Sequence, residues 1–205
     1  MDEQLTAPVG DVRDDTTPSH AGVALLLIDV INDMEFEGGE RLLAQAAGVV
    51  DALADLKRRA KAAGIPVIYV NDNFGRWQSD FKKQVAHVLE DGVRGASVAE
   101  RLLPDEDDYF VLKPRHSGFY STTLDTLLAY LGVDTLILAG FAADICVLFT
   151  ASDAYIRDFR IIIPADCVAS NEAEFTEQAL ALMARVLGAD VRPAFQLPLE
   201  RLAQS

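Results

Sequence analysis

The segment LILAGFAADICVLFT, residues 136–150, holds the most informative pattern in the chain. Its apolar run predicts a buried strand, Gly140 predicts a turn, and the spacing after the turn predicts a helix over residues 145–157. Cys146 falls in the first turn of that helix, where backbone N–H groups collect partial positive charge. The pattern therefore predicts a strand–turn–helix unit with a thiol at the end of the strand.

The same alternation of strands and helices extends along the chain. Apolar runs predict five strands and a short sixth one, at residues 23–29, 65–70, 108–114, 133–140, 159–167 and 189–192. Helical spacing predicts long helices at residues 40–63, 124–131, 145–157 and 172–187, with one or two short helices between residues 79 and 103. Such alternation is typical of βαβ units, so we expect an α/β fold with a mostly parallel sheet.

Composition limits the classes of partner. A chain of 205 residues that is 50% hydrophobic is expected to form one domain with a sizeable core. Residues 1–20 are polar and are predicted to be a flexible N-terminal arm, which leaves residues 21–205 as the domain. The net charge of −14 argues against nucleic acid and against a membrane as partners. Two cysteines without a disulfide pattern favour a cytoplasmic location.

Three residues at the predicted strand ends could carry chemistry. Ligands of open parallel sheets bind beyond the carboxyl ends of the strands, and Asp29, Lys113 and Cys146 all lie there. Helix N-termini and nearby cations lower the pKa of a thiol, so Cys146 is predicted to be a nucleophile. Asp29 would take the thiol proton and return it to the leaving amine. Lys113 would keep Asp29 ionised and help to stabilise the charge on the thiolate. Each residue also has a structural explanation. Cys146 could be a buried small side chain, Asp29 a helix cap and Lys113 a surface cation.

Other catalytic patterns are missing from the sequence. The histidines, His20, His87 and His116, do not pair at the spacing of a zinc site. No glycine-rich phosphate loop opens a helix. We therefore expect neither a metal nor an organic cofactor.

Three separated motifs carry a family resemblance. They are LLLIDVINDM around Asp29, KPRHSGFYST from Lys113 and GFAADICVLFTASDA around Cys146. Together they resemble the isochorismatase-like cysteine hydrolases, a family that includes nicotinamidases and N-carbamoylsarcosine amidohydrolases. The resemblance covers residues 21–194 and implies a catalytic triad of these three residues. It also implies a three-layer α/β/α, Rossmann-like fold with a six-stranded, mostly parallel sheet.

The resemblance implies further details of the nucleophile turn. The peptide bond between Phe141 and Ala142 would be cis, and the backbone N–H groups of Ala142 and Cys146 would form an oxyanion hole. The chain departs from the family at Ala143, where many relatives have Thr, and at Ile31, where Gln is frequent. The sequence does not tell what these departures do to activity.

Two further departures concern the reaction. Nicotinamidases typically bind a metal through histidines after the second strand, and the corresponding segment here, VNDNFGRW, has none. True isochorismatases usually lack the cysteine that this chain has. These features predict a metal-independent hydrolase that cleaves the carbon–nitrogen bond of a small amide, lactam or ureido substrate through a thioester at Cys146. The alternatives are a vinyl-ether hydrolase that uses Asp29, and a non-catalytic, thiol-sensing member.

The loops at the strand ends would set substrate choice. Candidate walls of the substrate pocket are Phe36, Asn73, Phe74, Trp77, Phe119 and Tyr120. Ordinary core or dimer-interface packing is the competing explanation for the aromatic residues. The resemblance also implies a homodimer or homotetramer, whereas the substrate itself does not follow from the sequence.

Overall fold

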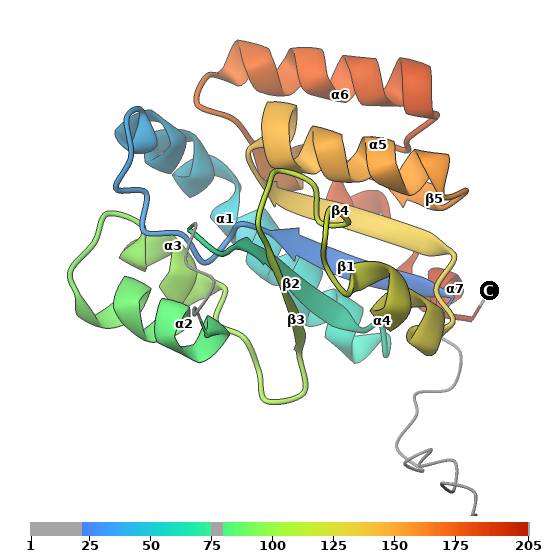
Figure 1. The fold of residues 1–205 in the computed structure, drawn as a ribbon. Helices are drawn as coiled ribbons and strands as arrows, with labels where there is room; N and C mark the ends of the chain where they lie inside the picture. The colour runs from blue at the N-terminus through green and yellow to red at the C-terminus, as the bar shows by residue number, and fades with distance from the viewer. Residues whose placement is uncertain (1–21, 75–79, 205) are drawn as a thin grey trace, which may run out of the picture.

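A central β-sheet separates two layers of helices (Figure 1). The structure, a computed structural model, describes residues 22–74 and 80–204. The strands are β1 (Val23–Ile28), β2 (Val67–Asp72), β3 (Tyr109–Lys113), β4 (Thr135–Phe141), β5 (Arg160–Ile162) and β6 (Val168–Ala169). They run parallel in the order β3-β2-β1-β4-β5, with β6 beside the end of β4. The predicted three-layer fold with a six-stranded parallel sheet is confirmed.

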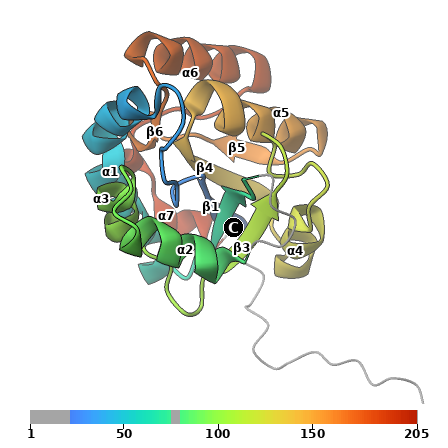
Figure 2. The same cartoon turned by 60° about the vertical axis from the view of Figure 1, so that its left-hand side comes forward.

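The helices are divided between the two faces of the sheet. They are α1 (Gly39–Ala62), α2 (Phe81–Glu90), α3 (Ala96–Arg101), α4 (Leu124–Leu131), α5 (Leu148–Ile156), α6 (Ala173–Leu187) and α7 (Leu199–Leu202). α1, α2, α3 and α7 supply core residues on one face, and α4, α5 and α6 supply them on the other. Figures 1 and 2 both show α5 and α6 side by side.

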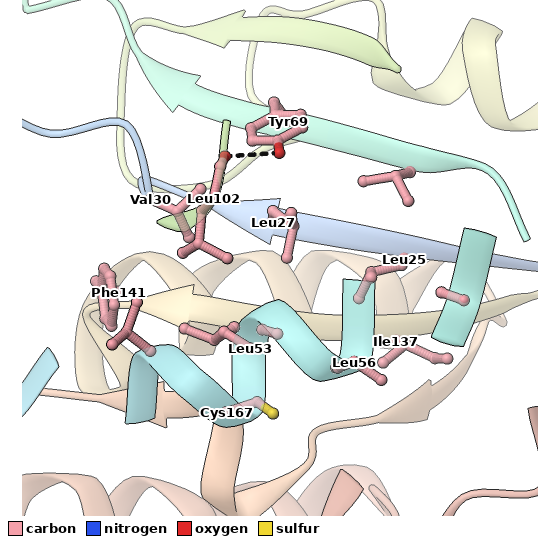
Figure 3. Packing of buried hydrophobic residues seen from close by; sticks show 14 of the residues in the cluster. Leu25, Leu27, Val30, Leu53, Leu56, Tyr69, Leu102, Ile137, Phe141 and Cys167 are labelled. Atoms are coloured by element: carbon pink, nitrogen blue, oxygen red, sulfur yellow. Dashed lines mark hydrogen bonds between the residues drawn. The ribbon is translucent and has the colours of Figure 1, made fainter. Parts of the chain in front are cut away.

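β1 lies at the centre of the sheet, and helices cover both of its faces. All six of its residues, Val23–Ile28, are fully buried, and alternate residues point to opposite faces. Figure 3 shows Leu25 and Leu27 on the face toward Leu53 and Leu56 of α1. Burial of each such leucine contributes ~1.5–3 kcal/mol to stability. The strand that precedes Asp29 is therefore held firmly on both sides.

The differences from the predicted elements cluster near the C-terminus. The sixth strand is Val168–Ala169, whereas residues 189–192 contribute one isolated bridge at Asp190. The predicted fifth strand is also too long, because a short 3₁₀ turn at Ala165–Cys167 follows β5. Pro164 explains this end, since proline cannot donate a ladder hydrogen bond. The predicted helix over residues 124–131 has the bounds of α4.

Among the helices of residues 22–74 and 80–204, none combines the length and the hydropathy that a bilayer span requires. The predicted N-terminal arm lies outside the described residues, so the domain boundary after residue 20 stays a prediction.

Candidate active site

The predicted catalytic residues gather where the chain changes direction across the sheet. β1 lies between β2 and β4, with β3 beyond β2 and β5 beyond β4. Ligands of such sheets bind beyond the strand ends at this switch point. Asp29 directly follows β1, Lys113 ends β3 and Cys146 follows β4, so all three share this edge.

Lys113 connects the other two residues. Its side chain is fully buried, and its Nζ lies 2.8 Å from Oδ2 of Asp29 and 3.5 Å from Sγ of Cys146. The main-chain N–H of Asp72, at the end of β2, donates to Oδ1 of Asp29 at 2.7 Å. A buried ammonium requires such partners, because an unpaired charge is costly to desolvate. One cation therefore joins a carboxylate and a thiol that come from different strand ends.

The backbone at Asp29 departs from strand geometry. Odd-numbered residues of β1 face α1, so continued alternation would point Asp29 to that side. Val111 belongs to the opposite core, and Lys113, two residues later in β3, faces that opposite side. Asp29 instead has a φ of 51°, a left-handed conformation that Asp tolerates better than most residues. This turn brings its carboxylate to Lys113.

The turn that carries Cys146 depends on a close approach between β1 and β4. Gly140 pairs with Ile28 and has a φ of +116°, and a Cβ there would lie 2.1 Å from the main-chain oxygen of Ile28. The following peptide bond, Phe141–Ala142, is cis, as the resemblance implied. Residues Ala143–Val147 then form a π-helical turn that leads into α5. Cys146 therefore lies, partly exposed, in the first turn of a helix, as predicted.

Hydrogen bonds fix the two loops beside Cys146. Thr150 of α5 donates its hydroxyl to the main-chain oxygen of Cys146 at 2.7 Å and accepts the N–H of Gly118 at 2.9 Å. This links the loop after β3 to the nucleophile turn. Ser170, after β6, donates to Oδ1 of Asp144 at 2.5 Å and accepts its main-chain N–H at 3.2 Å. Both contacts hold the turn from outside the triad.

Asp72 is the site residue that the sequence analysis missed. It pairs with Lys113 in the register of β2 and β3, and its Oδ2 lies 3.6 Å from Nζ of Lys113. Residues paired in adjacent parallel strands point to the same face, so the register alone would have identified it. The sequence does not give that register, so Asp72 could not be distinguished from its neighbours in the loop.

The pKa shifts correct one prediction. Burial raises the pKa of the Cys146 thiol to about 12, and the negative charge of Asp29 adds to the rise while Lys113 opposes it. The lowered pKa expected at a helix N-terminus is therefore wrong for the resting protein, because desolvation outweighs the nearby cation. The thiol stays protonated near neutral pH, and a base must remove its proton during a reaction.

Asp29 and Lys113 suit that requirement. Burial raises the pKa of the Asp29 carboxyl, although Lys113 opposes the rise. Burial alone would lower the pKa of Lys113, but the negative charge of Asp29 raises it, so the ammonium is retained. A carboxylate with a raised pKa is a better proton acceptor than an ordinary one.

Three of the predicted pocket walls lie on the loops after β1 and β2. Asn73 is buried, and its N–H donates to the main-chain oxygen of Lys113 at 3.0 Å. Phe74 is 38% exposed, with a φ of 51°, and its N–H donates to Oδ1 of Asp72 at 2.6 Å. Phe36 is exposed on the loop before α1. Their role as pocket walls stays a prediction.

The remaining pocket predictions have different outcomes. Phe119 is buried in the core on the α5 side, 6.0 Å from Phe159 between ring centroids, and its role as a pocket wall stays a prediction. Arg157 also covers its ring, at 4.6 Å, and Arg157 follows the end of α5 that is far from Cys146. Tyr120 is exposed, and Trp77 lies outside the described residues.

The two departures from the family pattern both lie in the core. Ile31 is fully buried on the α1 side, and its main-chain oxygen accepts a hydrogen bond from the side-chain amide of Asn71 at 2.8 Å. Ala143 is fully buried on the α5 side. Apolar side chains at both positions are therefore consistent with packing.

Two further features lie at the opposite edge of the sheet. Asp105, Asp107 and Asp108 cluster before β3, where Lys61 contacts all three carboxylates and Lys57 contacts Asp105 and Asp108. A cavity of about 840 Å³ lies between the C-terminal ends of α5 and α6 and the segment before α7. Neither feature includes residues at the carboxyl end of β4, which leads to Cys146.

Comparison with known proteins agrees with this geometry. The family model of the isochorismatase domain matches residues 23–193, which include Asp29, Lys113 and Cys146. The chain belongs to the isochorismatase family. The uncharacterized isochorismatase family protein YaaI of Bacillus subtilis is 42% identical over 179 residues, covering 87% of this chain and 98% of YaaI.

Other relatives of this isochorismatase-family chain have named activities. Ureidoacrylate amidohydrolase RutB of Methylorubrum extorquens is 30% identical over 167 residues, covering 69% of this chain and 67% of RutB. The crystal structure of N-carbamoylsarcosine amidase from Thermoplasma acidophilum aligns with a TM-score of 0.64 and 30% identity, over 86% of this chain and 98% of that one. By their names, both relatives hydrolyse carbon–nitrogen bonds.

Proposed function

We propose that this protein is a cysteine hydrolase that cleaves the carbon–nitrogen bond of a small amide, lactam or ureido substrate through a thioester at Cys146. The observation that carries the proposal is the position of Lys113, whose ammonium contacts both the Asp29 carboxylate and the Cys146 sulfur. A base, a cation and a thiol in contact are what acyl transfer to sulfur requires. The named amidohydrolases among the relatives support the same reaction class.

The first half of the reaction transfers the acyl group to sulfur. As the Cys146 sulfur attacks the substrate carbonyl carbon, its proton passes to Asp29, which the raised pKa of that carboxyl favours. The carbonyl oxygen becomes an oxyanion, for which the backbone N–H groups of Ala142 and Cys146 are the proposed donors. The carbon–nitrogen bond then breaks, Asp29 returns the proton to the leaving nitrogen, and a thioester remains.

The second half regenerates the enzyme with water. Asp29 takes a proton from water, whose oxygen attacks the thioester carbon. The carbon–sulfur bond breaks, the sulfur recovers a proton from Asp29, and the carboxylic or carbamic acid leaves. Lys113 keeps its proton throughout and stabilises the negative charge as it moves between oxygen and sulfur.

The proposal is tested with a panel of small amides, ureides and lactams. Hydrolysis of the amides and ureides is measured by ammonia release, and hydrolysis of the lactams is measured by ring opening. Cys146→Ala should lose activity by at least ~10³-fold, because the nucleophile is removed. Cys167→Ala is the matched control and should keep activity, because that thiol is buried in the core on the α1 side. If Cys146→Ala turned over substrate at the parent rate, the thioester mechanism would be wrong. Chemistry driven by Asp29 alone would then remain as the explanation.

Three broader expectations belong to the same proposal. The partners are the small substrate and water, in a cytoplasmic setting that suits the two free cysteines. A homodimer or homotetramer stays a prediction, testable by sedimentation. The residues to mutate in a test of this oligomer are exposed apolar side chains on the outer faces of adjacent helical segments: Ile145, Phe149, Ile156, Phe175, Leu182 and Val186.

A further inference from the structure

Three charged side chains meet at the candidate site, and their charges do not cancel. Lys113 is the cation, with Asp29 at 2.8 Å and Asp72 at 3.6 Å. When both carboxylates are ionised, one ammonium leaves one negative charge uncompensated. The side chain of Asp72 is 34% exposed, compared with 7% for Asp29 and 0% for Lys113. The uncompensated charge therefore lies on the member of the group that solvent and an arriving ligand can reach.

The local structure holds Asp72 in this position. Its Oδ1 accepts the N–H of Phe74, and its main-chain oxygen accepts a hydrogen bond from Nε2 of Gln84 at 2.9 Å. Gln84 is itself buried, and its Oε1 has no hydrogen-bond partner among the residues that the structure describes. These contacts leave Oδ2 of Asp72 directed at Lys113, beside the ammonium that also contacts Cys146.

No second cation compensates this charge within the described part of the chain. Lys113 is the only Lys or Arg there with a nitrogen within 4.0 Å of either carboxylate. Arg115, two residues further along, is exposed and forms no ion pair with Asp29 or Asp72. Among the described residues, a carboxylate on the substrate would therefore meet a negative charge and no guanidinium in an ion pair with it.

We propose that the site selects substrates that are neutral or positively charged beside the scissile bond, and that Asp72 causes it to reject carboxylates. This inference rests on the proposed amidohydrolase function for its substrate class. Charges of like sign a few ångströms apart in a partly buried site cost enough to change relative rates by ~10- to 100-fold. The selection would distinguish this chain from RutB, whose named substrate, ureidoacrylate, is a carboxylate.

The charge of the site can be measured without knowing the substrate. Cys146 is labelled with two methanethiosulfonates that differ in charge, the 2-aminoethyl cation and the 2-sulfonatoethyl anion, and 2-mercaptoethanol serves as the reference thiol. We expect the cation-to-anion rate ratio at Cys146 to exceed that of the reference at least ~10-fold. A change in the thiol pKa affects both reagents equally, so it cancels in the ratio. A wild-type ratio at or below the reference would overturn the proposal.

Substitution identifies the residue responsible. Asp72→Asn should bring the ratio most of the way to the reference value. Asp125→Asn is the matched control, because Asp125 is also a carboxylate in an ion pair, with Arg157, but lies on α4. An unchanged ratio in folded Asp72→Asn, or an equal loss in both variants, would contradict the assignment to Asp72.

Turnover provides the second measurement. Butyramide and succinamate have the same chain length and differ by one carboxylate, and we expect kcat/KM to favour butyramide by ~10-fold or more, less so in Asp72→Asn. Hydrolysis with succinamate preferred would refute the charge selection and leave the hydrolase proposal intact. A cation-selective Cys146 with no turnover of any amide would refute the hydrolase and leave the charge selection intact.

Discussion

The two cysteines of this chain form a natural comparison, because their thiols look alike until their neighbours are considered. Both are free, and burial raises the pKa of both thiols. Each also has a carboxylate partner, Asp29 for Cys146 and Asp166 for Cys167. Neither the protonation state nor the presence of a nearby acid therefore distinguishes the proposed nucleophile from the other cysteine.

Position and cation distinguish them. Cys167 is fully buried on the α1 side of the sheet, near Leu53 and Leu56 in Figure 3. Cys146 is partly exposed at a strand end on the other side, and the Lys113 ammonium lies 3.5 Å from its sulfur. A thiol becomes a candidate nucleophile here through access, a base and a stabilising cation together. It does so without the lowered resting pKa that activated cysteines often show.

Replacing the base should separate turnover from thiol reactivity, and it gives the largest effect. Asp29→Asn removes the proton acceptor, so turnover should fall ~10²–10⁴-fold. The same change removes a negative charge that raises the Cys146 pKa, so alkylation by iodoacetamide at neutral pH should become faster, about tenfold for each unit by which the pKa falls. Ammonia release and mass spectrometry of the labelled peptides measure the two quantities.

Cys167 serves as the internal reference in that experiment. Its labelling requires the core to open, so equal labelling of Cys167 in both proteins shows that Asp29→Asn has not loosened the fold. If turnover and Cys146 labelling fell together, Asp29 would activate the thiol at rest, contrary to the proposed order of events.

The pH profile tests the same order of events with a smaller effect. Activity requires ionised Asp29 and protonated Cys146, so kcat/KM should rise with pH through the raised pKa of Asp29. It should then stay level across pH 8–10, because the thiol pKa is about 12 and not the ordinary 9.0. Alkylation of Cys146 should instead increase about tenfold per pH unit over that range, since it needs the thiolate. A rise of kcat/KM with its midpoint near 9 would indicate a preformed thiolate.

Local patterns were sufficient to predict that Asp29, Lys113 and Cys146 lie at one edge of the sheet. Asp29, Lys113 and Cys146 each end or follow an apolar strand, and the parallel-sheet rule places such residues at one edge. The switch point between β1 and β4 could not be predicted, because strand order depends on contacts between segments distant in the sequence. The short β6 was missed for the same reason, since its two residues have no periodicity and form a strand only beside β4.

The missed parts of the site are those that depend on register and burial. Asp72 can be identified only from the register of β2 and β3, and Thr150 only from the packing of α5 against the loop after β3. The sign of the Cys146 pKa shift was wrong because helix position and charge can be inferred from sequence, whereas desolvation requires the packed structure. The burial of Phe119 could not be predicted either, because a loop aromatic beside a site motif does not reveal which way it packs.

The smallest expected effect lies at the other thiol. Cys167→Ala removes one buried sulfur from a packed core and should lower the free energy of unfolding by about 1 kcal/mol, as other small truncations do. Urea denaturation of the variant and the parent measures this difference, and Cys146→Ala should change stability less because its side chain is partly exposed. With the fold retained, kcat/KM of Cys167→Ala should stay within about twofold of the parent, since its sulfur lies on the opposite side of the sheet from Lys113. A folded Cys167→Ala protein that had lost activity would mean that the two faces of the sheet are coupled. The distinction drawn between the two cysteines would then be wrong.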